Sequence, residues 1–247
     1  MAQIWNSSRL GPDAALPSIN EVQVWIWHCR FAATHDSHLA VLSNAERGRA
    51  ARFAFERDRA RFAAAHAGLR HVLGGLLGIA PAAITMITDA HGKPRLAGPA
   101  RPPVFFNLSH SDDLAALAVS SAFDIGIDIE RVRDMDPNDV APFLSVAEQA
   151  ALMRLPGAAR RLGIFHAWTR KEAYLKAIGV GLAAPLDQFD VSIAPDEPAR
   201  ILRVAGAPAE ASAWWLVSIT PAPGYVGAVA ARAQGWHVTC HNLELAA

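Results

Sequence analysis

LSNAE at residues 42–46 returns as LSVAE at residues 144–148, and this repeat suggests how the chain is organised. In each copy a serine stands three residues before a glutamate, which is the spacing of a capping box at a helix start. Alternating patterns typical of strands precede the copies, at residues 22–28 and 124–130. The repeat, displaced by 102 residues, indicates two similar αβ halves that arose by duplication, and chance similarity of a short match is the alternative.

Long helical stretches follow both copies. The first spans about residues 47–77 with a break near Phe55, and the glycines at its end supply a stop. The second spans about residues 163–178 and ends at Gly179.

This order of elements predicts an α+β fold. We expect residues 1–121 and residues 122–247 to form two similar halves that pack as a pseudo-dimer. The cleft between such halves is the natural place for a ligand. Because one chain supplies both halves, a monomer is expected.

The composition suits a globular protein, since 52% of the 247 residues are hydrophobic and 19% are charged. Lysine plus arginine equals aspartate plus glutamate at 23 each, so no overall field favours nucleic acid or an anionic membrane. The chain shows no signal peptide and no apolar run long enough to span a membrane. Cys29 and Cys240 form no CxxC pair, which favours free thiols and a cytoplasmic protein.

The strand DIGIDIE at residues 124–130 alternates strictly, so its three isoleucines share one face. Asp124, Gly126, Asp128 and Glu130 share the other face. Carboxylates held side by side repel each other, and a hard divalent cation, magnesium or manganese, relieves that repulsion. Gly126 is expected to leave room for a bulky ligand. An edge strand whose acidic face is simply solvated is the alternative.

Three residues of the second long helix, Trp168, Glu172 and Lys176, recur at intervals of four and therefore line one face. Glu172 is a candidate metal ligand or base. Lys176 is a candidate to neutralise charge on a phosphate leaving group. An ordinary exposed ion pair between Glu172 and Lys176 is the alternative.

A polar turn is predicted between two apolar strands, at residues 103–108 and 114–119. Ser109 and His110 fall in this turn, where a hydroxyl, an imidazole and free amides suit phosphate oxygens. A purely structural turn is the alternative. A hydrolase pair is not favoured, because neighbours on a strand point to opposite faces and no GxSxG elbow is present.

Basic side chains gather in two other places. Lys93 lies in a predicted turn at residues 91–94, and six arginines crowd residues 47–61. Arginine can hold a phosphate bidentately, but we expect most of the six to form a solvated helix face. The chain has no Walker loop and no GxGxxG motif.

Five segments together resemble the motif series of the surfactin-type 4′-phosphopantetheinyl transferases, in that family's order and approximate spacing. They are GKP at 92–94, NLSHS at 107–111, GIDIE at 126–130, FLSVAE at 143–148 and WTRKEAYLKAIGVGL at 168–182. The resemblance runs from about residue 42 to residue 191. It implies two similar α+β halves with coenzyme A in the cleft between them, which agrees with the repeat.

The activity implied by the resemblance is that of the holo-acyl-carrier-protein synthase type. Such an enzyme moves the 4′-phosphopantetheine arm of coenzyme A onto a serine of an apo acyl, peptidyl or aryl carrier protein and releases 3′,5′-ADP. The resemblance implies that Asp128, Glu130 and Glu172 bind magnesium. The first-half equivalents of Asp128 and Glu130 are Ile26 and His28, so one metal site per chain is expected.

The remaining roles also come from the resemblance. Glu172 would take the serine proton, directly or through a bound water, and Lys176 would stabilise or protonate the departing phosphate oxygen. Lys93, Ser109 and His110 would hold the phosphates of coenzyme A.

One position departs from the family. Relatives carry a basic residue that grips the 3′-phosphate where this chain has Glu46, so Arg49 becomes the candidate for that contact. Glu148 matches an acidic family position whose role the sequence does not reveal. Two other functions stay open, a non-catalytic module that binds coenzyme A or a carrier protein, and a magnesium-dependent phosphohydrolase.

Overall fold

The computed structural model describes residues 5–8, 14–29, 35–98, 102–135, 140–180 and 185–244. Its helices are α1 (His35–Val41), α2 (Asn44–Ala50), α3 (Glu56–Leu77), α5 (Val146–Arg154), α6 (Gly157–Ile178) and α7 (Glu210–Ala213), with short 3-10 turns at Pro81–Ala83, Ala141–Phe143 and Leu186–Gln188. Its strands are β1 (Trp5–Ser8), β2 (Glu21–His28), β3 (Met86–Thr88), β4 (Pro94–Leu96), β5 (Phe105–Ser111), β6 (Leu114–Ser120), β7 (Ile125–Arg131), β8 (Phe189–Val191), β9 (Ile201–Val204), β10 (Trp215–Ile219), β11 (Tyr225–Ala231) and β12 (His237–Leu243).

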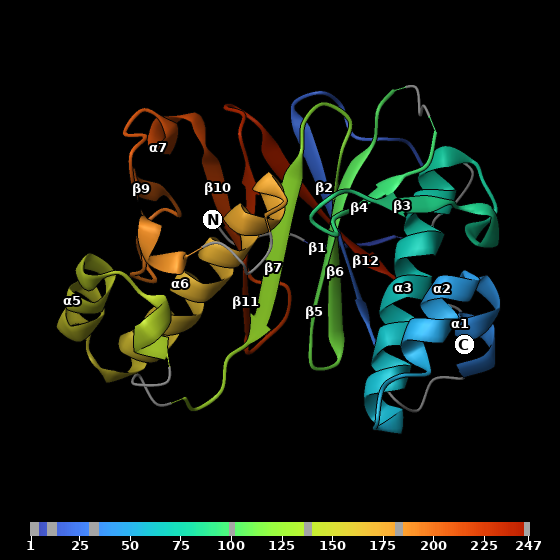
Figure 1. Ribbon diagram of the computed structural model, residues 1–247, viewed down its shortest axis with the longest axis horizontal. Coiled ribbons are helices and arrows are strands. Elements are labelled where there is room, and N and C mark those ends of the chain that lie inside the picture. The colour runs from blue at the N-terminus through green and yellow to red at the C-terminus, as the bar shows by residue number, and fades with distance from the viewer. Residues whose placement is uncertain are drawn as a thin grey trace.

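The elements stack in four layers, helix, sheet, sheet and helix (Figure 1). On one side α3 packs on the sheet β1-β12-β2-β6-β5, and on the other α6 packs on the sheet β10-β11-β7. The two sheets meet face to face in a core that includes Ile26 of β2, Ala116 of β6 and Ile127 of β7. Because α6 covers the other face of β7, Asp128 of this strand is held inside the molecule.

The two halves repeat one order of elements. Each has a strand (β2, β7), a short capped helix (α2, α5), a long helix (α3, α6) and a small hairpin (β3-β4, β8-β9). A larger hairpin follows (β5-β6, β10-β11), and its second strand pairs antiparallel with the first strand of the half. The predicted α+β fold of two similar halves is therefore confirmed. The boundary at 121/122 stays a prediction, and the late strand β12 pairs with β2 in the first sheet.

The repeated LSxAE stretch forms a capping box in both halves, as predicted. Glu46 accepts a hydrogen bond from Ser43 N at 2.8 Å, and Glu148 accepts one from Ser145 N at the same distance. Each glutamate also reaches the long helix of its own half. Glu46 pairs with the buried Arg70, and Glu148 pairs with the buried Lys171, both at 2.8 Å. The repeat thus preserves a buried ion pair that ties the short helix to the long one.

The boundaries of the long helices partly follow the predictions. The break near Phe55 is confirmed, and α3 ends at Gly78, whose φ of 67° suits glycine. The second helix, α6, begins at Gly157 rather than near residue 163, and ends as predicted at Gly179, with a φ of 77°. Among the described helices, none combines the length and apolarity needed to cross a membrane.

Candidate functional site at the seam of the two halves

The acidic strand β7 lies where the two halves meet, beside β5 of the other sheet (Figure 1). Asp128 is 4% exposed and Glu130 is half-buried. The alternative of a solvated acidic face is therefore wrong for Asp128. The isoleucines of the other face lie in the core between the sheets, as the alternation predicts.

The predicted polar turn at Ser109 and His110 is wrong. Both residues belong to β5, which continues to Ser111, and the hairpin turns at Asp112, whose φ is 48°. The strand can carry these polar residues because alternate side chains find partners on β7. Ser109 donates a hydrogen bond to Asp128 Oδ1 at 2.8 Å.

Helix α6 brings its polar face to the same place. Lys176 Nζ lies 2.6 Å from Asp128 Oδ1 and 3.3 Å from Ser109 Oγ. Glu172, one turn earlier on the helix, is buried. The alternative of an exposed ion pair between Glu172 and Lys176 is therefore wrong, because Lys176 pairs across to β7 instead.

Burial and neighbouring negative charge raise the pKa of two acids in this cluster, Glu172 and Glu130. Burial and, to a smaller extent, repulsion by Asp128 and Glu130 outweigh the charge of Lys176 and raise the pKa of Glu172 to about 7. Burial also raises the pKa of Glu130, with a smaller contribution from Asp128. Such perturbed acids in a polar cluster are typical of functional sites.

Two carboxylate oxygens of the cluster, Asp128 Oδ2 and Glu172 Oε1, are buried and have no hydrogen-bond partner among the described residues. Buried polar atoms are rarely left unpaired, so these oxygens fit a cation that prefers oxygen ligands. Within the described ranges, however, no three His, Cys, Asp or Glu side chains form a group ready to hold a metal. In this arrangement it is Lys176 that neutralises Asp128.

Gly126 has a different role from the one predicted. A Cβ atom at this position would lie 2.0 Å from Ala173 O and 2.4 Å from Ala177 N. The glycine therefore lets the backbone of α6 pack directly on β7, and the expectation that it leaves room for a ligand is wrong. This close packing places Glu172 and Lys176 over the acidic face of the strand.

Lys93 lies in the turn between β3 and β4, as predicted, but its amine points into the protein. Its Nζ donates to Asp124 Oδ1 at 3.1 Å and to the carbonyl oxygens of Ile125 and Ala177 at 3.0 Å each. These three acceptors use all three protons of the ammonium group. A direct contact between Lys93 and a phosphate would require one of these bonds to break.

His110 marks the positive side of the site. Its side chain is exposed, yet packing around the ring, together with the charges of His66, Lys176, Arg49 and Arg61, lowers its pKa to about 4. His110 therefore stands among cations contributed by α2, α3 and α6. This concentration of positive charge suits phosphate oxygens.

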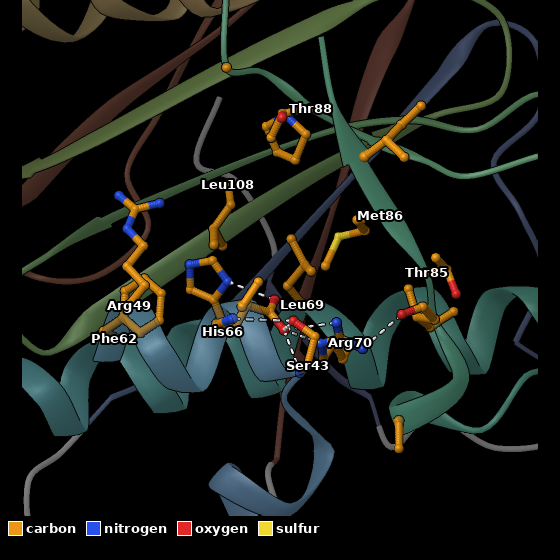
Figure 2. Close-up of a pocket in the computed structure, with 17 residues that line it drawn as sticks. Ser43, Arg49, Phe62, His66, Leu69, Arg70, Thr85, Met86, Thr88 and Leu108 are labelled. Atoms are coloured by element: carbon orange, nitrogen blue, oxygen red, sulfur yellow. Dashed lines mark hydrogen bonds and ion pairs between the residues drawn. The ribbon is translucent and has the colours of Figure 1, made fainter. Parts of the chain in front are cut away.

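A cavity of about 470 Å³ opens in the first half (Figure 2). Arg49 lies over the ring of Phe62, with 5.3 Å from its Cζ to the ring centroid, and His66 stacks on the same ring at 4.0 Å. The other residues that line the cavity come from the start of α2, from α3, β3, β4 and β5, and from the segments that lead into β3 and β4: Ser43, Ala45, Glu46, Leu69, Arg70, Ala82, Ile84, Thr85, Met86, Ile87, Thr88, Gly92, Pro94 and Leu108. The volume falls in the range of small-molecule sites.

Glu46 contributes no free negative charge to this cavity. Burial opposes its ionisation, but hydrogen bonds from His66 and Ser43 and the charge of Arg70 outweigh it and lower the pKa to about 2. Figure 2 shows these contacts gathered at one end of the cavity. The departure of Glu46 from the family pattern is thus accounted for by a contact inside the protein.

Sequence reasoning missed several residues. Phe62 and His66 line the cavity, yet an aromatic and an imidazole inside an alanine-rich helix resemble ordinary core residues.

A second, smaller cavity adjoins Glu130 and is bounded by Phe143 and Trp168, whose rings meet edge to face at 5.4 Å. The interval of four residues from Trp168 to Glu172, which places both on one helix face, is the signal for this cavity in the sequence. The motif positions Gly181 and Leu182 lie outside the described residues.

Comparison with protein families follows the two-half architecture. Residues 27–122 match the family described as 4′-phosphopantetheinyl transferase, N-terminal, and residues 124–230 match the 4′-phosphopantetheinyl transferase superfamily.

Individual relatives agree with these matches. The 4′-phosphopantetheinyl transferase HetI of a Nostoc species is 38% identical over 200 residues, covering 80% of this chain and 81% of that protein. A 4′-phosphopantetheinyl transferase of Bacillus subtilis is 32% identical over 165 residues, covering 67% of this chain and 72% of that protein. Another from Bacillus subtilis, Sfp, is 28% identical over 197 residues, covering 80% and 85%.

Proposed function

The chain belongs to the 4′-phosphopantetheinyl transferase superfamily, it transfers phosphopantetheine from coenzyme A to a carrier protein, and we propose that the seam between its halves is the active site. One observation carries this proposal. Buried oxygens of Asp128 and Glu172 without partners among the described residues lie in the cluster that holds Lys176.

We propose that Asp128, Glu130 and Glu172 hold magnesium or manganese. Oxygen donors, mutual repulsion and two unpartnered buried oxygens support this assignment. A bound divalent cation would supply charge neutralisation at the pyrophosphate of coenzyme A. Lys176 would then turn from Asp128 toward a phosphate oxygen, since a metal would take over the charge that Lys176 now neutralises.

Coenzyme A is proposed to run from the cavity to the carboxylate cluster. The cavity would take its nucleotide end, with Arg49 at the rim as the candidate for the 3′-phosphate. His110 interacts electrostatically both with Arg49 and His66 at the cavity and with Lys176 at the cluster. The phosphates would therefore pass over His110, with Ser109 beneath them next to Asp128.

The transfer can be written with the residues present. The serine oxygen of the carrier protein bonds to the β-phosphorus, the bond to the 3′,5′-ADP oxygen breaks, and Glu172 accepts the serine proton. A carboxylate buried beside other carboxylates is more basic than a solvated one and suits this task. Lys176 stabilises the charge that develops on the departing oxygen.

The role of Lys93 as a phosphate contact stays a prediction. Its three hydrogen bonds favour a structural role, since they join the β3-β4 turn to the start of β7 and the end of α6. We also propose that the protein acts in the cytoplasm. We propose that it is a monomer, because β5 and β7 of one chain supply both sides of the seam.

Neither alternative function is favoured by the relatives, all of which are named as transferases. The fate of the phosphopantetheine distinguishes the three. Coenzyme A, magnesium and an apo carrier protein would be incubated with the enzyme and the small molecules separated by mass. The proposal predicts 3′,5′-ADP with no free phosphopantetheine, whereas a phosphohydrolase would release both without a carrier and a binding module would release neither.

A further inference from the structure

Strands β5 and β7 lie side by side across the seam but belong to different sheets. Side chains of β5 take the place of a main-chain ladder. Asn107 Oδ1 accepts a hydrogen bond from Ile127 N at 2.9 Å, and Ser109 Oγ accepts one from Ile129 N at 3.3 Å. Ser111 Oγ accepts the next, from Arg131 N at 3.1 Å.

These three bonds form a regular series, because both strands advance by two residues from one bond to the next. Side chains two apart on a strand share one face, so the three rungs all point toward β7. We name Asn107, Ser109 and Ser111 the seam ladder. It satisfies main-chain amides along the edge of β7 that has no neighbouring strand in its own sheet, where they would otherwise lack partners.

Two rungs of the seam ladder also bind carboxylates. A hydroxyl has one proton to donate and two lone pairs to accept with, so it can serve an amide and a carboxylate together. Ser109 Oγ donates to Asp128 Oδ1 at 2.8 Å, and Ser111 Oγ donates to Glu130 Oε2 at 2.6 Å. Each serine therefore holds a carboxylate in a fixed position relative to the main chain of β7.

We infer that Ser111 is a positioning residue for Glu130, and that the two serines of the seam ladder, Ser109 and Ser111, set the geometry of the metal-binding carboxylates of the second half. This inference rests on the proposed metal role of Glu130. Ser109 contacts Lys176 as well, whereas the hydrogen bonds of Ser111 go to the amide of Arg131 and to Glu130. Ser111 is thus the rung at which positioning can be tested separately.

The test measures manganese binding directly, by the loss of the free Mn²⁺ signal in electron paramagnetic resonance, with coenzyme A present. Removing a hydrogen bond to a metal ligand weakens metal binding by roughly 10- to 100-fold. We expect Ser111→Ala to weaken manganese binding by about 10-fold. Ser111→Thr keeps a hydroxyl on a β-branched side chain that suits a strand, so it should bind manganese like the unmodified enzyme.

Two controls separate positioning from stability. Asn107→Ala removes a rung whose bond goes to a main-chain amide, and Ser120→Ala removes a buried hydroxyl that accepts from the amides of Ala122 and Phe123. Both variants should lower the melting temperature while leaving the manganese affinity of the folded protein unchanged.

Each outcome of the manganese-binding measurement has a distinct consequence. An unchanged manganese affinity in Ser111→Ala, or an equal loss in Ser111→Ala and Ser111→Thr, would overturn the positioning role while leaving the metal site standing. If the unmodified enzyme with coenzyme A bound no manganese, the metal role of Glu130 would fall, and the positioning role with it.

Discussion

Lys176 Nζ lies 2.6 Å from Asp128 Oδ1, and this pair connects the last turns of α6 to the middle of β7. The contact depends on the close approach of helix and strand that Gly126 permits. It places a cation at the buried carboxylate of Asp128, with Glu172 and Glu130 next to it. The seam therefore holds positive and negative groups close enough to serve a phosphate and a metal together.

Replacing Lys176 by alanine should slow turnover more than it weakens binding of coenzyme A. Loss of one group that stabilises charge in the transition state costs roughly 100- to 1,000-fold in kcat. Steady-state kinetics would show a large fall in kcat with a small change in KM for coenzyme A. A rise in KM with kcat preserved would assign Lys176 to ground-state binding only.

The stability of the metal-free protein should fall as pH rises through neutrality. The pKa of Glu172 is raised from 4.5 to about 7, so the stability that its protonated form contributes is complete below about pH 4.5 and is lost as pH rises through about 7. Magnesium should therefore raise the melting temperature more at about pH 8 than at about pH 5.5. Glu172→Gln cannot ionise and should show little of this pH dependence. An equal effect of magnesium at both pH values would count against the carboxylate cluster as the metal site.

Gly126→Ala should damage both stability and transfer. The added methyl group would meet the main chain of α6 at Ala173 and Ala177, so helix and strand must move apart. Overpacking of this kind costs about 1–3 kcal/mol or more, and it would displace Glu172 and Lys176. Gly48→Ala is the matched control, because a Cβ there meets nothing within 4 Å and alanine suits a helix. Denaturant unfolding and transfer rates of the two variants would be compared, and similar behaviour would refute the packing role of Gly126.

Glu148→Ala should destabilise the second half strongly. It leaves the ammonium group of Lys171 buried without its carboxylate, a change that costs about 3–5 kcal/mol. Glu56→Ala, which removes an exposed partner of Arg59, should cost about 0.5 kcal/mol or less. Urea unfolding would measure the free energy of unfolding of both variants. Comparable decreases would show that the buried ion pair contributes little to the packing of α5 on α6.

Arg49→Ala should raise KM for coenzyme A with a smaller effect on kcat, because Arg49 lies at the cavity rim over Phe62. Arg52→Ala removes an exposed arginine that does not line the cavity and should leave KM unchanged. Dephospho-coenzyme A lacks the 3′-phosphate. If Arg49→Ala does not raise KM for this substrate, the contact between Arg49 and the 3′-phosphate is supported. An equal fold-increase in KM for both substrates would show that Arg49 does not contact the 3′-phosphate.

Local patterns predicted much of this protein. The capping boxes at Ser43 and Ser145 and the helix stops at Gly78 and Gly179 are local features, since the residues involved lie within a few positions of one another. The alternation of β7 also predicted which side chains face the core. The repeat of such features, together with the family resemblance, indicated the two-half fold.

Partners distant in sequence produced the errors. Ser109 appeared to belong to a turn because its polar neighbours interrupt an apolar strand, yet their partners lie on β7, about 20 residues further along. Lys93 lies in a turn as predicted, and its bond to Ala177 O is a further distant contact that the pattern does not show. A sequence pattern does not show which backbone groups will be left unpaired when two sheets meet, and on β7 those groups decided the position of Ser109.

The most direct test of the central claim is the intact mass of an apo carrier protein after incubation with this enzyme and coenzyme A. Acyl, peptidyl and aryl carriers would be tested in parallel, with magnesium, with a chelator, and with Asp128→Asn in place of the unmodified enzyme. We predict a gain of one phosphopantetheine on at least one carrier, which is lost with the chelator and with Asp128→Asn although that variant remains folded. A gain that persists in the chelator or in Asp128→Asn would contradict the assignment of the carboxylate cluster at the seam.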